Sequence, residues 1–206
     1  MVNEAIPDIV VSRLPLYLQC LQRMKTAGVK TTNSQVLGQM LGISAAQIRK
    51  DLSQFGEFGK QGTGYSVDFL VEQLQQILQV NKIWKIAVIG AGDLGHAIAR
   101  YGGFADRGFQ IALVFDSDPQ KIGKEAAGFK IHDTANMVEM IKTAGIQVAM
   151  LTVPARVAQE VADQLVKAGV HAILNYAPIT LKLPEGVYVE YIDPILKLQR
   201  MTYYLK

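Results

Sequence analysis

Apolar residues follow two different patterns along the chain, and the change between them divides it near residue 80. Up to that point, spacings of three and four residues predict amphipathic helices at about 13–27, 34–41, 45–54 and 67–81. Residues 1–11 show little periodicity, and a loosely held arm is expected there. Beyond residue 80, short runs of β-branched and small residues alternate with helical stretches, a pattern typical of a parallel sheet covered by helices.

The second half of the chain predicts a doubly wound α/β domain. Its expected strands are 86–89, 111–115, 129–132, 147–152, 172–174 and 187–190, and its expected helices are 94–101, 137–144, 157–169 and 194–205. The last helix has no sheet face left to cover. A partner subunit is the simplest explanation for its apolar stripe of Ile195, Leu198 and Met201.

A glycine-rich loop follows the first of these strands and is the strongest chemical signal in the chain. Gly90, Gly92 and Gly95 have the spacing G-x-G-x-x-G between a strand and a helix whose apolar stripe includes Leu94 and Tyr101. Gly90 permits the tight turn, Gly92 lets the backbone approach a pyrophosphate, and Gly95 allows the helix to pack closely on the strand. The helix N-terminus then supplies N–H groups for the phosphates.

An acid completes the dinucleotide fingerprint. Asp116 ends the next strand, 21 residues after Gly95, where a carboxylate can accept both hydroxyls of the adenosine ribose. The following Ser117-Asp118-Pro119 has no arginine, and its acid would repel a 2′-phosphate, so NAD(H) is favoured over NADP(H). Lys121 is interpreted as a solvated lysine, and a contact with the adenosine end of the cofactor is the alternative. The strand ends at 90–95, 152–154 and 175–178 should line one crevice.

Residues 13–54 predict a helix-turn-helix. Ser44 and Gln47 form a capping box that starts its third helix, with Ile48 and Leu52 facing inward. Gln47, Arg49 and Lys50 are then left outside, where a recognition helix meets bases and phosphates. The alternative is a solvated helix face with an internal ion pair between Arg49-Lys50 and Asp51.

Glycines and aromatic residues alternate from Phe55 to Tyr65, which cannot be helical. After a helix-turn-helix, this stretch favours a β-hairpin wing with Lys60 and Gln61 at its tip, where they can enter a minor groove or touch phosphate. A structural linker is the alternative.

Composition restricts the class of protein. The 206 residues carry a net charge of +3, a single cysteine, Cys20, and no apolar run near the roughly 20 residues that span a bilayer. No signal peptide is evident either, so a soluble cytoplasmic protein without internal disulfides or membrane contact is expected. His96, His132 and His171 belong to no recognisable catalytic or metal spacing, and the nucleotide fold leaves no room for a substrate domain. The dinucleotide is therefore expected to be sensed and not used in catalysis.

Taken together, the motifs resemble the Rex family of bacterial redox-sensing transcriptional repressors over nearly the whole chain. The residues that carry the resemblance are 13–18, 47–56, 59–65, 90–95, 151–154, Gly169 and 173–178. It implies three parts: a winged-helix DNA-binding domain over 1–80, a Rossmann NAD(H) domain over 81–190, and a domain-swapped C-terminal helix over 191–206. It also implies a homodimer that binds an inverted-repeat operator with NAD⁺ and releases it with NADH.

These arguments give two sets of candidate site residues. Cofactor contacts are expected from Gly90, Ala91, Gly92, Asp93, Leu94, Gly95, Tyr101, Asp116, Thr152, Val153, Pro154, Asn175 and Tyr176. DNA contacts are expected from Arg13, Ser44, Ala46, Gln47, Arg49, Lys50, Lys60 and Gln61. By resemblance, Tyr101 lies beside the nicotinamide and Asp193 of the exchanged helix is its switch partner, whereas Gln19 and Pro194 depart from the family pattern.

Two other functions remain open from the residues alone. One is a small NAD-dependent oxidoreductase with a helical appendage. The other is a coenzyme A-binding or structural Rossmann module whose N-terminal part only dimerises.

Overall fold

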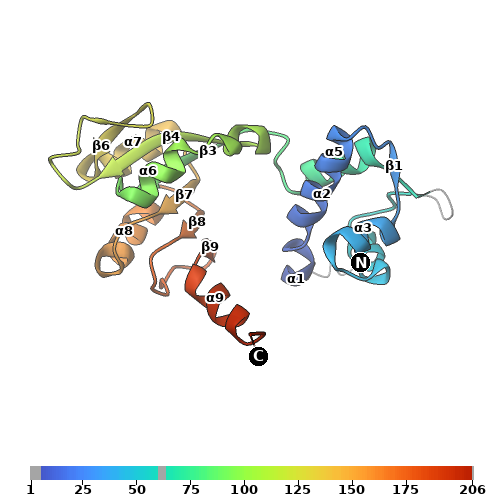
Figure 1. Cartoon of the computed structure of the whole chain (residues 1–206). Coiled ribbons are helices and arrows are strands. Elements are labelled where there is room, and N and C mark those ends of the chain that lie inside the picture. The colour runs from blue at the N-terminus through green and yellow to red at the C-terminus, as the bar shows by residue number, and fades with distance from the viewer. Residues whose placement is uncertain (1–5, 60–63, 206) are drawn as a thin grey trace. The chain divides into compact units, whose positions relative to one another are not determined.

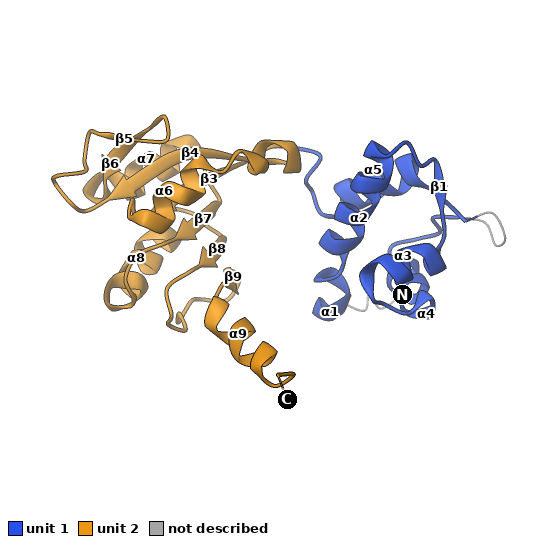
Figure 2. Cartoon of the chain, in the orientation of Figure 1, with its two compact units in different colours: residues 1–82 blue, residues 83–206 orange. Residues whose placement is uncertain are grey.

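The computed structural model describes residues 6–59 and 64–205. The chain forms two compact units, Met1–Lys82 and Ile83–Lys206, and each has its own hydrophobic core (Figure 2).

The first unit is a helical domain with a small two-stranded sheet. Its elements are α1 (Asp8–Val11), α2 (Leu14–Thr26), β1 (Thr31–Thr32), α3 (Ser34–Leu41), α4 (Ala45–Ser53), β2 (Tyr65–Ser66) and α5 (Val67–Ile77). Helix α2 packs on α5 and on α3, and α3 packs on α4. The four predicted helices α2, α3, α4 and α5 each bury apolar residues, including fully buried Leu21, Leu37, Ile48 and Leu74.

Local capping signals set the limits of the helix-turn-helix. The Asn33 side chain accepts hydrogen bonds from the N–H groups of Gln35 and Val36 at the start of α3. Gly42 ends that helix in the left-handed conformation, with φ of 68°. Ser44 then caps α4 by accepting from the Gln47 N–H at 3.2 Å. The predicted helix at 34–41 is therefore confirmed at both ends.

Two parts of the first unit differ from the sequence prediction. The expected N-terminal arm contains the short helix α1, whose Val10 is buried. Helix α5 ends at Ile77 and not near Asn81, because the chain turns at Gln79, which has φ of +55°.

The small sheet places the wing segment against the chain before α3. β2 pairs with β1 in antiparallel register, and the Val67 N–H extends the pairing by donating to the Lys30 carbonyl at 3.0 Å. The described residues 55–59 contain no strand, so β2 takes its partner from β1 and not from the preceding segment. The predicted tip residues, Lys60 and Gln61, lie outside the described residues.

The second unit is a seven-stranded sheet covered by helices (Figure 1). Its elements are β3 (Trp84–Ile89), α6 (Asp93–Arg100), η1 (Gly102–Arg107), β4 (Phe109–Asp116), β5 (Glu125–Ala126), β6 (Phe129–Asp133), η2 (Thr134–Asn136), α7 (Met137–Ala144), β7 (Val148–Leu151), α8 (Ala155–Lys167), β8 (Ala172–Asn175), β9 (Tyr188–Tyr191) and α9 (Pro194–Thr202).

The strand order is β5-β6-β4-β3-β7-β8-β9, and every neighbouring pair from β6 to β9 is parallel. Without the short antiparallel β5, this is the doubly wound Rossmann order, with the point of reversal at β3. The predicted fold class is confirmed. The hairpin strand β5 was missed because two residues are too few to show periodicity.

Alternate residues of β3 belong to the two different layers of the core. Ala87 and Ile89 lie in the cluster formed with α7 and α8, whereas Ile86 and Val88 lie in the cluster formed with α6. The continuous apolar run was therefore a correct sign of a strand buried on both faces.

The helix after the glycine loop buries a narrower face than predicted. Gly95, Ile98 and Ala99 are its buried residues, whereas Leu94 and Tyr101 are 45% and 53% exposed. The predicted apolar stripe was therefore wrong at these two positions, which instead line hollows beside the loop. Among the described residues, no helix is long and apolar enough to cross a membrane.

Candidate functional site

The three glycines of the loop meet different surroundings. A Cβ at Gly90, which has φ of +102°, would lie 2.7 Å from the Thr152 carbonyl oxygen, so the turn packs directly against the end of β7. A Cβ at Gly95 would contact the Gly90 carbonyl oxygen, so only glycine lets α6 approach the strand this closely. A Cβ at Gly92 would have nothing within 4 Å. Gly92 therefore borders open space that another molecule can approach.

The same loop ends at a helix N-terminus. Gly92 is the N-cap of α6, and its lack of a side chain leaves the first turn without a side-chain cap. The N–H groups of this turn are donors at the positive end of the helix dipole. An open backbone beside such donors fits a pyrophosphate.

Thr152 fixes the loop from the neighbouring strand. Its hydroxyl lies 2.9 Å from the Ile89 carbonyl oxygen and 2.8 Å from that of Gly90. Its backbone N–H also donates to the Ile89 carbonyl at 2.9 Å. Thr152 was predicted as a cofactor contact, and the structure gives it a second task, because it holds the glycine turn in place.

Asp116 ties together the two loops that border the cleft. It is 8% exposed, and its Oδ2 accepts from the Ala91 N–H at 2.8 Å, while its Oδ1 accepts from the Asp118 N–H at 2.9 Å. Lys121 Nζ forms an ion pair with Oδ2 at 3.1 Å. Burial alone would raise the pKa of Asp116, but these donors hold it below its ordinary value. Lys121 is therefore paired with Asp116, although its side chain stays 38% exposed.

These residues border a cleft of about 610 Å³ at the carboxyl ends of the strands. This volume is in the range of small-molecule sites, roughly 300–1,000 Å³. Of the predicted cofactor contacts, the cleft is lined by Gly90, Gly92, Leu94, Asp116, Thr152, Val153, Pro154 and Tyr176. The lining that the sequence reading missed is Ile89, Ser117, Lys121, Thr134, Arg156, Val157, Glu160, Val161 and Gln164. Most of these follow directly after a strand end or lie on α8, so the crevice rule could have found them.

Asn175 is the last residue of β8 and Tyr176 follows it, but the two side chains have different roles. Asn175 is 1% exposed, accepts from the Ala177 N–H at 2.9 Å and donates to the carbonyls of Ala177 and Ile179. It shapes the loop and is absent from the cleft lining among the described residues. Tyr176 lines the cleft, and burial raises the pKa of its phenol.

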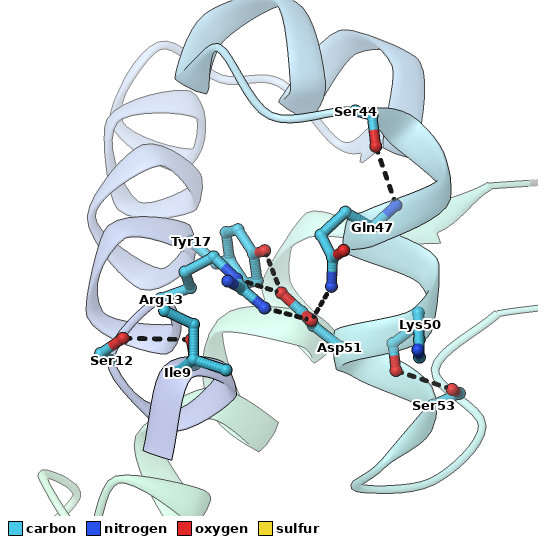
Figure 3. A network of polar contacts seen from close by, with 9 residues as sticks. All are labelled: Ile9, Ser12, Arg13, Tyr17, Ser44, Gln47, Lys50, Asp51 and Ser53. Carbon is cyan, nitrogen blue, oxygen red and sulfur yellow. Dashed lines mark hydrogen bonds and ion pairs between the residues drawn. The ribbon is translucent and has the colours of Figure 1, made fainter. Parts of the chain in front are cut away.

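The candidate recognition helix α4 carries a buried acid, Asp51, whose several hydrogen bonds were not predicted from the sequence. Asp51 is fully buried and accepts from Arg13 Nε at 2.6 Å, Arg13 Nη2 at 2.7 Å, Tyr17 OH at 2.6 Å and Gln47 Nε2 at 2.7 Å (Figure 3). Burial alone would raise the pKa of Asp51, but Arg13, Tyr17 and Gln47 hold it below its ordinary value. The alternative of an ion pair within a solvated Arg49-Lys50-Asp51 face was therefore wrong.

The comparisons with known proteins match each of the two units to a described family. Residues 5–53 match a family described as a putative DNA-binding protein N-terminus, and residues 81–179 match a family described as a CoA binding domain. The redox-sensing transcriptional repressor Rex of Roseiflexus sp. (strain RS-1) is 52% identical, over 98% of this chain and 92% of the relative.

The chain belongs to the Rex family.

Solved structures of one Rex-family repressor, RSP, resemble the chain over nearly its full length. RSP in complex with β-NAD⁺ and operator DNA has a TM-score of 0.93 and 37% identity, covering 98% of this chain and 93% of RSP. RSP in complex with β-NADH has a TM-score of 0.89 and 35% identity, covering 97% of this chain and 94% of RSP.

The other DNA-contact candidates of this Rex-family chain lie on the surface of α4 and its cap. Ser44, Ala46, Arg49 and Lys50 are exposed. Arg49 Nη1 donates to the Ser34 hydroxyl at 2.9 Å, which links α4 to the first turn of α3. Gln47 is half-buried, because its amide is bound to Asp51. It therefore does not complete the capping box through its side chain.

Tyr101 and Asp193, the expected nicotinamide contact and switch residue of the Rex family, occupy helix ends. The Tyr101 ring packs edge-on against Phe104, with ring centroids 5.2 Å apart, and lines an open hollow with His96 and Arg100. A Cβ at Gly103 would lie 2.5 Å from the Tyr101 hydroxyl, so the ring lies directly over this glycine. Asp193 caps α9 by accepting from the Ile195 N–H at 2.9 Å.

Proposed function

We propose that this Rex-family protein is a transcriptional repressor that binds operator DNA as a homodimer and leaves it when NADH occupies the nucleotide cleft. The observation that carries the proposal is Gly92: its Cβ position faces open space at a helix N-terminus, beside a buried acid, in a chain that also has a helix-turn-helix. The RSP complexes with β-NAD⁺ and operator DNA and with β-NADH support the same pairing of ligands.

The choice of NAD(H) over coenzyme A follows from Asp116. The coenzyme A ribose carries a 3′-phosphate, whereas both hydroxyls of the NAD adenosine ribose are available as donors. Asp116 is buried with a lowered pKa, so it is ionised at neutral pH, accepts hydroxyls and repels a phosphate. Asp118, two residues later, adds a second negative charge. Competition between the two nucleotides for the purified protein tests this choice.

On the DNA side, α4 supplies the reading surface. Arg49 and Lys50 are exposed cations on this helix, and Gln47 presents an amide beside them. Arginine suits guanine, glutamine suits adenine and lysine suits phosphate. A helix of this kind docks in the major groove with its N-terminal half toward the bases. We place the protein in the cytoplasm, where both operator DNA and the dinucleotide pool are found.

The homodimer is supported by α9. None of its nine residues is buried, and Ile195, Leu196, Leu198 and Met201 are each more than half exposed. Figure 1 shows the helix extending away from the sheet of its own unit. A stripe of this kind is stable when a second copy covers it, and exchange of the helix between protomers gives a closed twofold dimer.

The proposed signal is the charge of the nicotinamide ring, which is positive in NAD⁺ and neutral in NADH. An apolar surrounding at the dimer interface favours the neutral ring, because burial of an unpaired charge is costly. By linkage, a ligand that favours the DNA-free arrangement is in turn weakened by DNA.

A gel-shift titration of an inverted-repeat operator with NADH and with NAD⁺ at fixed ionic strength tests the proposal. We expect NADH to release the operator and NAD⁺ to leave it bound. Operator binding that is indifferent to the NADH/NAD⁺ ratio would refute the proposed function. The competing oxidoreductase function predicts NADH oxidation with a metabolite panel, and we expect none.

A further inference from the structure

We infer that Asp51 is a positioning residue for operator recognition, because it orients Gln47 and Arg13 before DNA arrives. This inference rests on the proposed function, since it assigns a task within the DNA-contacting surface. The Asp51 carboxylate is the meeting point of donors from the entry to α2 and from α4 (Figure 3).

The contact with Gln47 decides which edge of the amide faces outward. Gln47 and Asp51 are four residues apart on α4, so their side chains lie on the same helix face. Gln47 Nε2 donates to Asp51 Oδ1 at 2.7 Å. The carboxamide has two amide hydrogens, and Asp51 takes one of them. The second hydrogen and Oε1 are the donor and acceptor that a bidentate contact with adenine requires.

The contact with Arg13 orients a guanidinium in the same way. Nε and Nη2 form a two-point fork with the Asp51 carboxylate at 2.6 and 2.7 Å. Two of the five N–H donors are thereby occupied, and the plane of the guanidinium is fixed. Arg13 stands at the N-cap of α2 with its side chain 19% exposed. Its remaining donors can reach a phosphate only in the direction that Asp51 sets.

The number of donors distinguishes this arrangement from an ordinary ion pair. Asp51 accepts four hydrogen bonds, and Tyr17, which is 1% exposed, supplies the fourth from inside the core. A buried ion pair that serves stability alone can often be replaced by apolar residues. Here two of the three partners, Arg13 and Gln47, are only half-buried and are themselves candidates for DNA contact, and an apolar replacement could not orient them.

The alternative is that Asp51 only holds α4 against α2. A double-mutant cycle separates the two, because a purely structural acid and a base-reading amide act independently. The proteins are the wild-type chain, Asp51→Asn, Gln47→Ala and the double variant. The measurement is the ratio of affinities, in the presence of NAD⁺ at fixed salt, for an operator and for single-base variants of it. Tyr17→Phe is the matched control, since it removes one donor from Asp51 but leaves both DNA-facing partners.

We expect Gln47→Ala to lower the affinity ratio about tenfold at one base position, equivalent to about 1.4 kcal/mol. Asp51→Asn should lower it similarly at the same position, because an amide cannot accept all of these donors. The double variant should then be no worse than either single change. Tyr17→Phe should keep the wild-type ratio. Unchanged base preference in Asp51→Asn, or losses that multiply in the double variant, would overturn the inference.

A second measurement keeps the inference testable if Asp51→Asn does not fold. The side-chain amide order parameter of Gln47 in the DNA-free protein should be high, whereas that of the exposed Gln35 on α3 should be low. Equal mobility of the two amides would contradict the inference. Failure of the proposed function gives a different result, since the wild-type chain itself would then not distinguish the operator from scrambled DNA.

Discussion

Gly92→Ala should strongly weaken NADH binding while leaving the fold intact. The backbone at this position is extended, with φ of −82° and ψ of −169°, which alanine adopts without strain. The added Cβ would meet nothing within 4 Å. The free energy of unfolding is therefore expected to change by no more than about 1 kcal/mol, because the lower entropy of the unfolded chain with alanine and the poorer N-cap preference of alanine oppose each other.

The loss of affinity follows from where that methyl group lies. It would occupy the open space at the N-terminus of α6, through which a pyrophosphate reaches the backbone N–H groups. A hydrogen bond to a charged group contributes about 1.5–3 kcal/mol. Loss of one such bond weakens binding by about ten- to 150-fold.

Fluorescence titration with NADH measures this loss, and thermal unfolding in the absence of nucleotide measures the stability. The operator complex of Gly92→Ala should also resist NADH concentrations that release the wild-type protein. Gly102→Ala is the matched control, because its Cβ also meets nothing within 4 Å but does not line the cleft. If Gly92→Ala binds NADH within twofold of the wild type, the assignment of this loop to the pyrophosphate is wrong.

Three further changes test other parts of the molecule. Gly95→Ala brings a Cβ onto the Gly90 carbonyl oxygen, so it should lower the free energy of unfolding by about 1–3 kcal/mol, seen in urea titrations. Asp51→Ala leaves the Arg13 guanidinium without its carboxylate partner and should lower the free energy of unfolding by about 3 kcal/mol at pH 7. Folding lowers the pKa of Asp51, so the ionised carboxylate stabilises the fold fully above the unfolded pKa of about 3.9. This stabilisation is lost as the pH falls through the folded pKa. The free energies of unfolding of the wild type and the variant should therefore become similar in acid. Leu198→Asp should convert dimers to monomers in light scattering without loss of helix; an unchanged mass would count against the α9 interface.

The features that the sequence predicted well depend on neighbours in the chain. Asn33 and Ser44 bond to N–H groups two or three residues away, so their positions identify the helix starts directly. The glycine spacing likewise records a strand, a turn and a helix that follow one another directly along the chain. The doubly wound parallel sheet was predicted from the alternation of strands and helices, because parallel strands need helical crossovers.

The features that were missed depend on partners distant in the sequence. Arg13 and Asp51 are 38 residues apart, and Ala91 and Asp116 are 25 apart, so no local pattern shows either bond. Tyr101 was expected on a buried stripe from its spacing alone. Periodicity cannot distinguish an apolar residue that faces a core from one that faces a hollow.

Asp51 in the first unit and Asp116 in the second have the same structural role. Each is a buried carboxylate with a lowered pKa, and each accepts from elements that meet a proposed ligand. Burial of such a charge costs several kcal/mol unless its donors stay at hydrogen-bond distance, so each acid resists any rearrangement of the groups around it. Both sites are therefore formed before their ligands arrive, which lowers the ordering cost of binding. We accordingly expect NADH to act on the arrangement of two preformed DNA-contacting surfaces in the proposed dimer, and not on the internal geometry of either surface.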